Sequence, residues 1–506
     1  MKEVLGTIVS TLEGPSPSQI DFVVLADKTL HKGMFVELEY SEGLMVAMVQ
    51  ELVKTNRYFE RPDSVKSIGV EIEKNFPIAD WEFLIAKAKP LGVFINNSFS
   101  RPTFPPSPGT KVFIAENENI KKFLGLDLNG LHLGEVQFHN LVLKVNLSKV
   151  LQKHLAVLAM SGAGKSYFVS VLLEELLSRK KELGQVAVVA FDTHGEYTSF
   201  GSPTNVAKDY SSQTRIINAS KLKIGLGNMD VHTLSNIVSN ITPKQKSVLF
   251  RLLNKLRKEM KSGTGPFDLN AVRAELNETE IEQKTKDSLN SIIDELDSFR
   301  LFSKVDSQSI FDLAKPGQLT VIDLNDVISE KIKQLIVAYF SKKFFELRRN
   351  KQIPPITILV EEAHNFIPGI TASENAIARY PLRLIAREGR KFGVSLIIVS
   401  QRPKFLDTTT LANCNTNIIL RITNPTDLDH IKQSSESLDI NSSNLISSLR
   451  VGEALIVGEA VNAPTFFKVR LRNSAPSKHE TTLEEAAKRY QEEKNKMNDE
   501  LDSLIL

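Results

Sequence analysis

The chain is poor in the residues that would link it covalently or hold it in a membrane. Cys414 is the single cysteine among 506 residues. One thiol excludes an intrachain disulfide framework and a CxxC zinc site, suits a reducing compartment, and is expected to be a small core residue. The N-terminus lacks an apolar signal segment, and no uncharged apolar run approaches the ~20 residues that span a bilayer. These absences predict a cytoplasmic protein without membrane contact.

An excess of one charge sign is also missing. The chain has 63 Lys and Arg against 60 Asp and Glu, a net charge of +3, and an isoelectric point near 8.6. This balance neither indicates nor excludes a nucleic-acid partner, because any basic surface would have to be local. The length suggests about three domains, with ample material for buried cores.

The most informative stretch is Ala-Met-Ser-Gly-Ala-Gly-Lys-Ser at 159–166. A short apolar run precedes it, and a segment with helical spacing follows it. Because glycines 162 and 164 have no Cβ, backbone N–H groups can wrap phosphates at the N-terminus of the next helix. The lysine adds a cation, and the following serine hydroxyl can ligate Mg²⁺. The pattern predicts a nucleotide phosphate-binding loop, and a plain Gly/Ser helix start is the disfavoured alternative. The predicted binding residues are Ser161, Gly162, Ala163, Gly164, Lys165, Ser166 and Tyr167, with Ser166 also on the metal.

The pattern along the chain predicts an α/β protein with additions. Several short apolar strands before residue 100 favour a small β-barrel, and the proline-rich stretch 101–109 marks its boundary. Strands then alternate with helices, as in a parallel sheet covered on both faces. The expected division is 1–100 barrel, 101–230 first part of the core, 231–302 helical insertion, 303–475 second part of the core, and 476–506 a helical tail that either docks or is solvated.

An apolar strand at 356–360 ends in Glu361 and Glu362. Adjacent carboxylates repel, so they must face water, a metal or a cation. ATP hydrolysis needs one carboxylate near Mg²⁺ and another that orients the attacking water. We assign Glu361 to the metal and Glu362 to the water. Two solvent-exposed glutamates at a strand end are the alternative.

Two further strand ends carry polar candidates. Asp192 and Glu196 lie just beyond a strand, where open parallel sheets bind ligands, and are expected to support the metal and the water, with His194 positioning them. An Asp192 that only caps the next turn is nearly as plausible. Gln401 follows another strand and is a candidate sensor of the γ-phosphate, with a plain strand cap as the alternative.

A basic cluster at 383–393 contains Arg387 and Arg390. Such a cluster is usually a solvated helix end. Phosphoryl transfer, however, gains from an arginine that a neighbouring subunit supplies. Either arginine is therefore a candidate for action in trans, which implies a ring.

These strings together resemble the archaeal HerA DNA translocases, a branch of the RecA-like ring ATPases that also includes FtsK and the conjugation coupling proteins. The most specific are Asp-Thr-His-Gly-Glu-Tyr at 192–197 and Glu-Glu-Ala-His-Asn-Phe at 361–366. The family usually has Gly where Ala159 stands and Asp where Glu361 stands. The likeness implies a RecA-like P-loop ATPase core with a parallel-rich sheet, an N-terminal barrel and a helical insertion.

The resemblance also implies function. It predicts a homohexamer that uses ATP and Mg²⁺ to thread double-stranded DNA, and that acts with a NurA-type nuclease and other resection proteins at broken DNA ends. A P-loop ATPase for protein remodelling or conjugation-type coupling, and a nucleotide-gated ring scaffold, are the alternatives. The sequence leaves open the direction of movement, strand separation, the DNA-contacting loops, the adenine pocket, which arginine acts in trans, and the nuclease-docking surface.

Overall fold

The computed structural model describes residues 3–10, 14–56, 59, 81–95, 98–203, 208–229, 233–234, 237–238, 241–369, 376–434, 440–477, 483–485, 487–492 and 494. The chain divides into two compact units. The first comprises Met1–Lys165 and Cys414–Leu471, and the second comprises Ser166–Asn413 and Arg472–Leu506.

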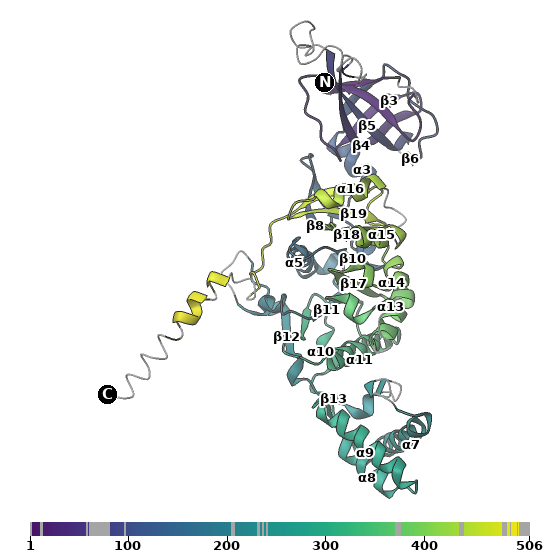
Figure 1. Ribbon diagram of the computed structural model, residues 1–506, viewed down its shortest axis with the longest axis vertical. Helices are drawn as coiled ribbons and strands as arrows, with labels where there is room; N and C mark the ends of the chain where they lie inside the picture. The colour runs from purple at the N-terminus through teal and green to yellow at the C-terminus, as the bar shows by residue number, and fades with distance from the viewer. Residues whose placement is uncertain are drawn as a thin grey trace, which may run out of the picture. The chain divides into compact units, whose positions relative to one another are not determined.

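The first unit begins with a closed barrel of six antiparallel strands (Figure 1). The strand order is β2-β1-β7-β3-β4-β5, pairing of β2 with β5 closes the barrel, and β6 extends it beyond β5. Register shifts in the β4–β5 pair bend these two long strands, which lets both serve the closed wall. The strands are β1 (Val4–Ile8), β2 (Ile20–Val24), β3 (Phe35–Tyr40), β4 (Gly43–Asn56), β5 (Glu82–Ile95), β6 (Ser98–Ser100) and β7 (Lys111–Ile114). The small barrel predicted from the sequence is confirmed, and β7 completes it from beyond the proline-rich stretch.

The rest of the first unit is a mixed sheet. Its order is β10-β18-β19-β20-β8-β9, in which only β10 and β18 are parallel. Cys414, at the start of the segment that returns to this unit, is buried as expected, and burial raises the pKa of its thiol. The strands are β8 (Leu131–Val136), β9 (Val142–Val145), β10 (Leu155–Leu158), β18 (Thr416–Ile419), β19 (Glu453–Gly458) and β20 (Thr465–Val469). The helices are α3 (Asn117–Leu124), α4 (Leu147–Leu151), α15 (Pro425–Ser434) and α16 (Ile440–Ser448).

Buried polar contacts hold barrel strand β3 to this sheet within the first unit. The carboxylate of Glu37 is fully buried and accepts hydrogen bonds from Glu116 N at 3.1 Å and Asn119 Nδ2 at 2.8 Å, at the start of α3. Phe35 N donates to His139 Nε2 at 3.0 Å, in the turn between β8 and β9. Burial lowers the pKa of His139 to about 4, so this imidazole stays a neutral acceptor.

The core of the second unit is an all-parallel run of strands in the order β12-β15-β11-β16-β17. The inner strands β11 and β16 are buried at every position, as expected of parallel strands covered on both faces. Helices α11 and α13 lie together along one side of these strands (Figure 1). The strands are β11 (Ala187–Asp192), β12 (Thr214–Asn218), β15 (Leu319–Asp323), β16 (Ile356–Val360) and β17 (Val394–Ser400). The sequence pattern predicts strands at 185–191, 319–323, 356–360 and 394–399, which correspond to β11, β15, β16 and β17, whereas β12 was not predicted.

The helices of this core fall into two groups by length. The long ones are α5 (Lys165–Leu177), α11 (Glu330–Arg349) and α13 (Arg379–Phe392), and the short ones are α10 (Ile310–Leu313), α12 (Ala363–Phe366) and α14 (Thr408–Ala412). Short 3-10 turns are η4 (Lys181–Leu183), η5 (Thr198–Gly201), η6 (Ser211–Gln213), η7 (Ala219–Lys221), η8 (Leu226–Asn228) and η10 (Pro403–Phe405), and a two-stranded ladder joins β13 (Ile224–Gly225) to β14 (Phe302–Ser303).

The described part of the insertion is helical, and it includes a short helix besides the regions 245–261 and 280–299, whose amphipathic pattern indicates helices. Its helices are α7 (Pro243–Glu259), α8 (Leu269–Glu278) and α9 (Gln283–Ser298), and η9 (Met260–Thr264) follows α7. A capping box of Thr242 and Gln245 starts α7, and the Asp268 side chain caps α8. The start of the expected insertion and most of the expected tail lie outside the described residues. No helix in the described part of the chain is long and apolar enough to cross a membrane.

Candidate active site

The glycine-rich loop follows β10 in the first unit. Gly162 and Gly164 have φ of +75° and +93°, which side chains with a Cβ rarely adopt. Among the described residues, apart from Gly162 and its two chain neighbours, no heavy atom lies within 4 Å of where a Cβ of Gly162 would stand. The loop is closed by Ala163 N donating to Met160 O at 3.3 Å, and α5 begins at Lys165. The loop therefore leaves open space at a helix N-terminus, where backbone N–H groups favour an anion.

Four other predicted loop residues have distinct surroundings. Ser161 is exposed, Ser166 is half-buried, and Lys165 is 5% exposed. Ala159 is fully buried and is not among the described residues with a positive φ, so this position does not require the glycine that is usual in the family. The Tyr167 hydroxyl accepts a hydrogen bond from Arg472 N at 2.7 Å, which ties α5 to the segment after residue 471 inside the second unit.

Glu361 and Glu362 lie directly beyond β16 in the second unit, and both are buried. Glu361 is 0% exposed and Glu362 is 4% exposed. The alternative of two solvated glutamates is therefore wrong. Buried carboxylates are costly unless hydrogen bonds or cations compensate them, so the partners of each side chain indicate its role.

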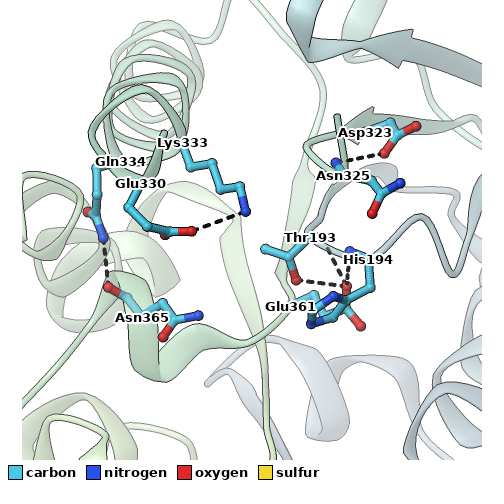
Figure 2. Close-up of polar contacts among 9 residues, drawn as sticks. All are labelled: Thr193, His194, Asp323, Asn325, Glu330, Lys333, Gln334, Glu361 and Asn365. Carbon is cyan, nitrogen blue, oxygen red and sulfur yellow. Dashed lines mark hydrogen bonds and ion pairs between the residues drawn. The ribbon is translucent and has the colours of Figure 1, made fainter. Parts of the chain in front are cut away.

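Glu361 is held by the turn that follows the neighbouring strand β11. Its Oε2 accepts from Thr193 N at 3.0 Å, from Thr193 Oγ1 at 3.1 Å and from His194 N at 3.3 Å (Figure 2). Its own backbone N donates to Phe191 O at 3.1 Å, which extends the ladder between the strands. The carboxylate thus joins the ends of two adjacent parallel strands in one fixed arrangement.

Asp192 organises the same turn. Its carboxylate accepts from the backbone N of His194 at 3.3 Å, of Glu196 at 3.0 Å and of Tyr197 at 2.8 Å. The capping geometry considered for Asp192 is therefore present. Burial raises the pKa of Asp192, while hydrogen bonds from Glu361 and from the turn backbone oppose that rise. Burial, with the surrounding carboxylates, also raises the pKa of the Tyr197 hydroxyl well above its usual value.

The backbone of Glu362 is strained. Its φ and ψ are both +46°, a left-handed conformation that costs a non-glycine residue about 1–3 kcal/mol. Asn365 N donates to Glu362 O at 2.8 Å as α12 begins, and Glu362 Oε2 lies 3.3 Å from His364 Nδ1. His364 Nδ1 also lies 3.1 Å from the hydroxyl of Ser400, the last residue of β17. The strain turns Glu362 away from the direction that Glu361 takes, so the adjacent carboxylates have different partners.

The remaining candidates lie on β17 and α13. Gln401 follows the end of β17 and is half-buried. Arg387 and Arg390 are exposed on α13. Within the described chain neither has a hydrogen bond or an ion pair at contact distance, although Lys391, helped by the charge of Arg387, lowers the pKa of Glu388. Arg379 and Arg383, earlier on the same helix, instead approach the buried Asp407 carboxylate at 3.4 and 3.3 Å. The structure thus separates structural arginines from two that project into solvent.

Three residues of this arrangement were not predicted from the sequence as functional candidates: Thr193, His364 and Ser400. Thr193 and His364 lie within the two strings that carry the family resemblance, which was a usable signal. Ser400 begins Ser-Gln-Arg-Pro at 400–403, a string that the family resemblance also covers, but the sequence does not show that its hydroxyl lies beside His364. Among the described residues, no group of three or more His, Cys, Asp or Glu side chains is arranged to hold a metal ion.

This chain has a glycine loop that leads from a buried strand into a helix, and carboxylates at the end of a parallel strand. These two features define the class of P-loop ATPases. The fold agrees: the solved structure of VirB4 of Thermoanaerobacter pseudethanolicus superposes with a TM-score of 0.55 at 18% identity, covering 68% of this chain and 97% of that one. The fold expected from the sequence is confirmed.

Sequence comparisons identify the family. The profile described as "Helicase HerA, central domain" matches residues 131–344. The chain is 31% identical to the "DNA double-strand break repair helicase HerA" of Saccharolobus solfataricus, over 91% of this chain and 92% of that one. The protein of the same name from Sulfolobus acidocaldarius is 28% identical, over 93% and 94% of the two chains. The chain belongs to the HerA family and is an ATP-hydrolysing helicase or translocase.

Proposed function

We propose that the chain is an ATP-driven translocase on double-stranded DNA, working as a homohexameric ring on double-strand-break ends with a NurA-type nuclease and other resection proteins. Several relatives that align over about nine-tenths of both chains are named for double-strand break repair, which supports the biological setting. The catalytic part of this proposal rests on the different surroundings of two adjacent buried residues, Glu361 and Glu362. Glu361 is fixed by a backbone turn, whereas Glu362 faces His364 from a strained backbone.

ATP and Mg²⁺ fit the residues present. The positive φ of Gly162 and Gly164, with open space at Gly162, suits a loop that wraps phosphate oxygens. In our proposal Lys165 neutralises phosphate charge, and Ser161, Ala163 and Tyr167 complete the cradle. Bound Mg²⁺ would neutralise further negative charge, and Ser166, Glu361 and Asp192 would hold it directly or through water.

The other proposed roles belong to groups that act on water and on the developing charge. Glu362 would accept a proton from the attacking water, with Glu196 supporting the water. Gln401 would contact the γ-phosphate, donating to it and accepting from water. Arg387 or Arg390 of one subunit would stabilise charge at the site of the next, which fits two cations that project into solvent.

The test is ATP turnover with and without duplex DNA over a range of salt. We expect DNA to raise kcat, and Lys165→Ala to abolish turnover or nucleotide binding in both conditions. Hydrolysis that is unchanged by DNA at every salt concentration would contradict the motor. Ring formation in ATP without turnover would instead favour the nucleotide-gated scaffold. Normal turnover in Lys165→Ala would remove the phosphate-loop assignment.

A further inference from the structure

The loop that follows β17 presents two cations and an aromatic ring. Arg402, Lys404 and Phe405 are exposed, and Phe405 retains 39% of its accessible surface. The Arg402 guanidinium carbon and Lys404 Nζ lie 6.0 and 5.0 Å from the centre of the Phe405 ring. Cation–π contacts at these distances hold the positive side chains near one another at the surface.

The backbone of this loop is anchored beside the segment that follows Glu362. Pro403 and Leu406 are buried, Gly369 N donates to Phe405 O at 2.9 Å, and Asp407 N donates to Ile367 O at 2.9 Å. A β-bridge pairs Pro368 with Leu406. A shift of the loop would therefore be felt directly by the segment that leads back to α12.

A chain of polar contacts runs from the same loop to Glu362. Arg402 N donates to Ser400 Oγ at 3.1 Å, Ser400 Oγ lies 3.1 Å from His364 Nδ1, and this nitrogen lies 3.3 Å from Glu362 Oε2. With the hydrogen on Nδ1, His364 can donate well to only one of Ser400 and Glu362 at a time. The position of Ser400, which Arg402 N–H helps to set, then affects how firmly His364 holds Glu362.

Exposed cations backed by an aromatic ring suit the phosphates of nucleic acid, whose recognition is independent of sequence. We propose that loop 402–405 contacts the phosphates of duplex DNA, and that His364 and Ser400 are positioning residues that couple this contact to Glu362. The inference rests on the proposed function and deepens it. It identifies a DNA-contacting loop and a physical path by which DNA changes the rate of hydrolysis.

The DNA contact is tested with the full chain and a labelled duplex in a non-hydrolysable ATP analogue. We expect the double variant Arg402→Ala/Lys404→Ala to weaken binding by ~10-fold or more at moderate salt. The slope of log K against log salt should become shallower by about two. The matched control is Arg251→Ala/Lys258→Ala on α7, two exposed cations that line one surface depression together with the exposed Phe250. Equal losses in both double variants would overturn the loop assignment.

The coupling is tested with Ser400→Ala. We expect this variant to bind DNA as the wild type does, to lose most of the DNA-dependent rise in kcat, and to keep its KM for ATP. Ser400→Thr restores the hydroxyl and should restore the stimulation, which a purely structural role would not predict. Ser341→Ala is the matched control, because Ser341 is a fully buried serine on α11 whose hydroxyl has no hydrogen-bond partner among the residues that the structure describes.

The outcomes are distinct. Full stimulation in Ser400→Ala, or the same loss in Ser400→Thr, would overturn the coupling while leaving the proposed function intact. A wild type that DNA does not stimulate would overturn the proposed function, and this inference with it. Thermal melting of each variant shows whether it folds. His364→Asn repeats the coupling test at the residue that lies between Ser400 and Glu362.

Discussion

Glu361 and Glu362 illustrate how one residue of separation changes the chemistry of a side chain. Both are buried, but the backbone donors of the turn after β11 hold Glu361, and the left-handed backbone of Glu362 directs it to His364. Left-handed strain at a non-glycine residue persists only where surrounding contacts fix it, and it gathers at functional sites. The strain at Glu362 supports a catalytic role for this residue.

The first residue-scale prediction separates the two carboxylates. Glu362→Gln should bind ATP but hydrolyse it ~10²–10⁴-fold more slowly, because the amide cannot accept the proton of the water. Glu361→Gln keeps an acceptor for the turn but loses the negative charge that we propose faces Mg²⁺. Its rate should therefore recover partly when Mg²⁺ is raised, whereas that of Glu362→Gln should not. Single-turnover kinetics across a magnesium titration measure both, and a wild-type rate in Glu362→Gln would move the role to Glu361 or Glu196.

At the residue scale, the sequence predicts sites whose residues are adjacent in the chain. It does not predict which distant side chains the fold brings into contact. The loop at 161–167 was found because its residues are adjacent and the spacing itself is the signal. The partners of Glu361 lie in the turn after β11, and Ser400 at the end of β17 contacts His364, the partner of Glu362; no local pattern joins these residues. Only the fold brings such side chains together.

Among the elements, the turn between β8 and β9 has an unusual construction. Phe138 has a φ of +62° and is 49% exposed, with its ring stacked on His31 at 4.5 Å. The next residue, His139, turns inward and accepts the hydrogen bond from Phe35 N in barrel strand β3. The turn therefore attaches the barrel to the sheet of the first unit through one neutral imidazole.

This attachment predicts a pH-dependent stability. The pKa of His139 is about 4 in the folded chain against 6.5 when solvated, so the unfolded chain binds more protons between these values. Stability should be full above about pH 6.5 and fall by up to about 3 kcal/mol as the pH drops to about 4. Denaturant titrations at several pH values measure the free energy of unfolding. In His139→Gln, which keeps a hydrogen-bond acceptor, the part of its decrease at low pH that comes from His139 should be absent. His31→Gln is the matched control, and an unchanged pH profile in His139→Gln would refute the assignment.

The elements that the sequence predicted are those with local periodicity. The apolar runs of β15 and β16 and the amphipathic spacing of α7 and α9 are visible in a short window. By contrast, β20 pairs with β8, joining Val469 to Gly134, and no window contains both. The short α8 was not predicted, although Asp268 caps it.

At the scale of the whole molecule, the exposed arginines of α13 predict shared active sites. Arg390→Ala and Lys165→Ala subunits should each be inactive alone. The first lacks the arginine that would act at the neighbouring subunit's site, and the second lacks the lysine that would bind phosphate at its own site. Mixed in one ring, they should regain part of the ATPase activity, since some interfaces then combine an intact loop with an intact arginine. Titrating the ratio measures this, and Arg387→Ala in place of Arg390→Ala shows which residue acts.

The matched control for mixing is Arg251→Ala, an exposed arginine on α7 that should stay active alone. Particle mass with and without ATP and duplex DNA establishes the ring in which the mixing occurs. No recovery at any ratio, in particles that demonstrably contain both variants, would favour an arginine that acts within its own subunit.

The single cysteine has a practical consequence for following such a machine at work. Cys414 is enclosed, and its thiol keeps its proton, so thiol-reactive dyes should leave the native chain almost unlabelled. A cysteine introduced at Phe250 on the insertion, or at Phe405 beside the proposed DNA track, would then take a fluorophore selectively. Energy transfer between two such dyes could report, turnover by turnover, how each ATP is converted into motion.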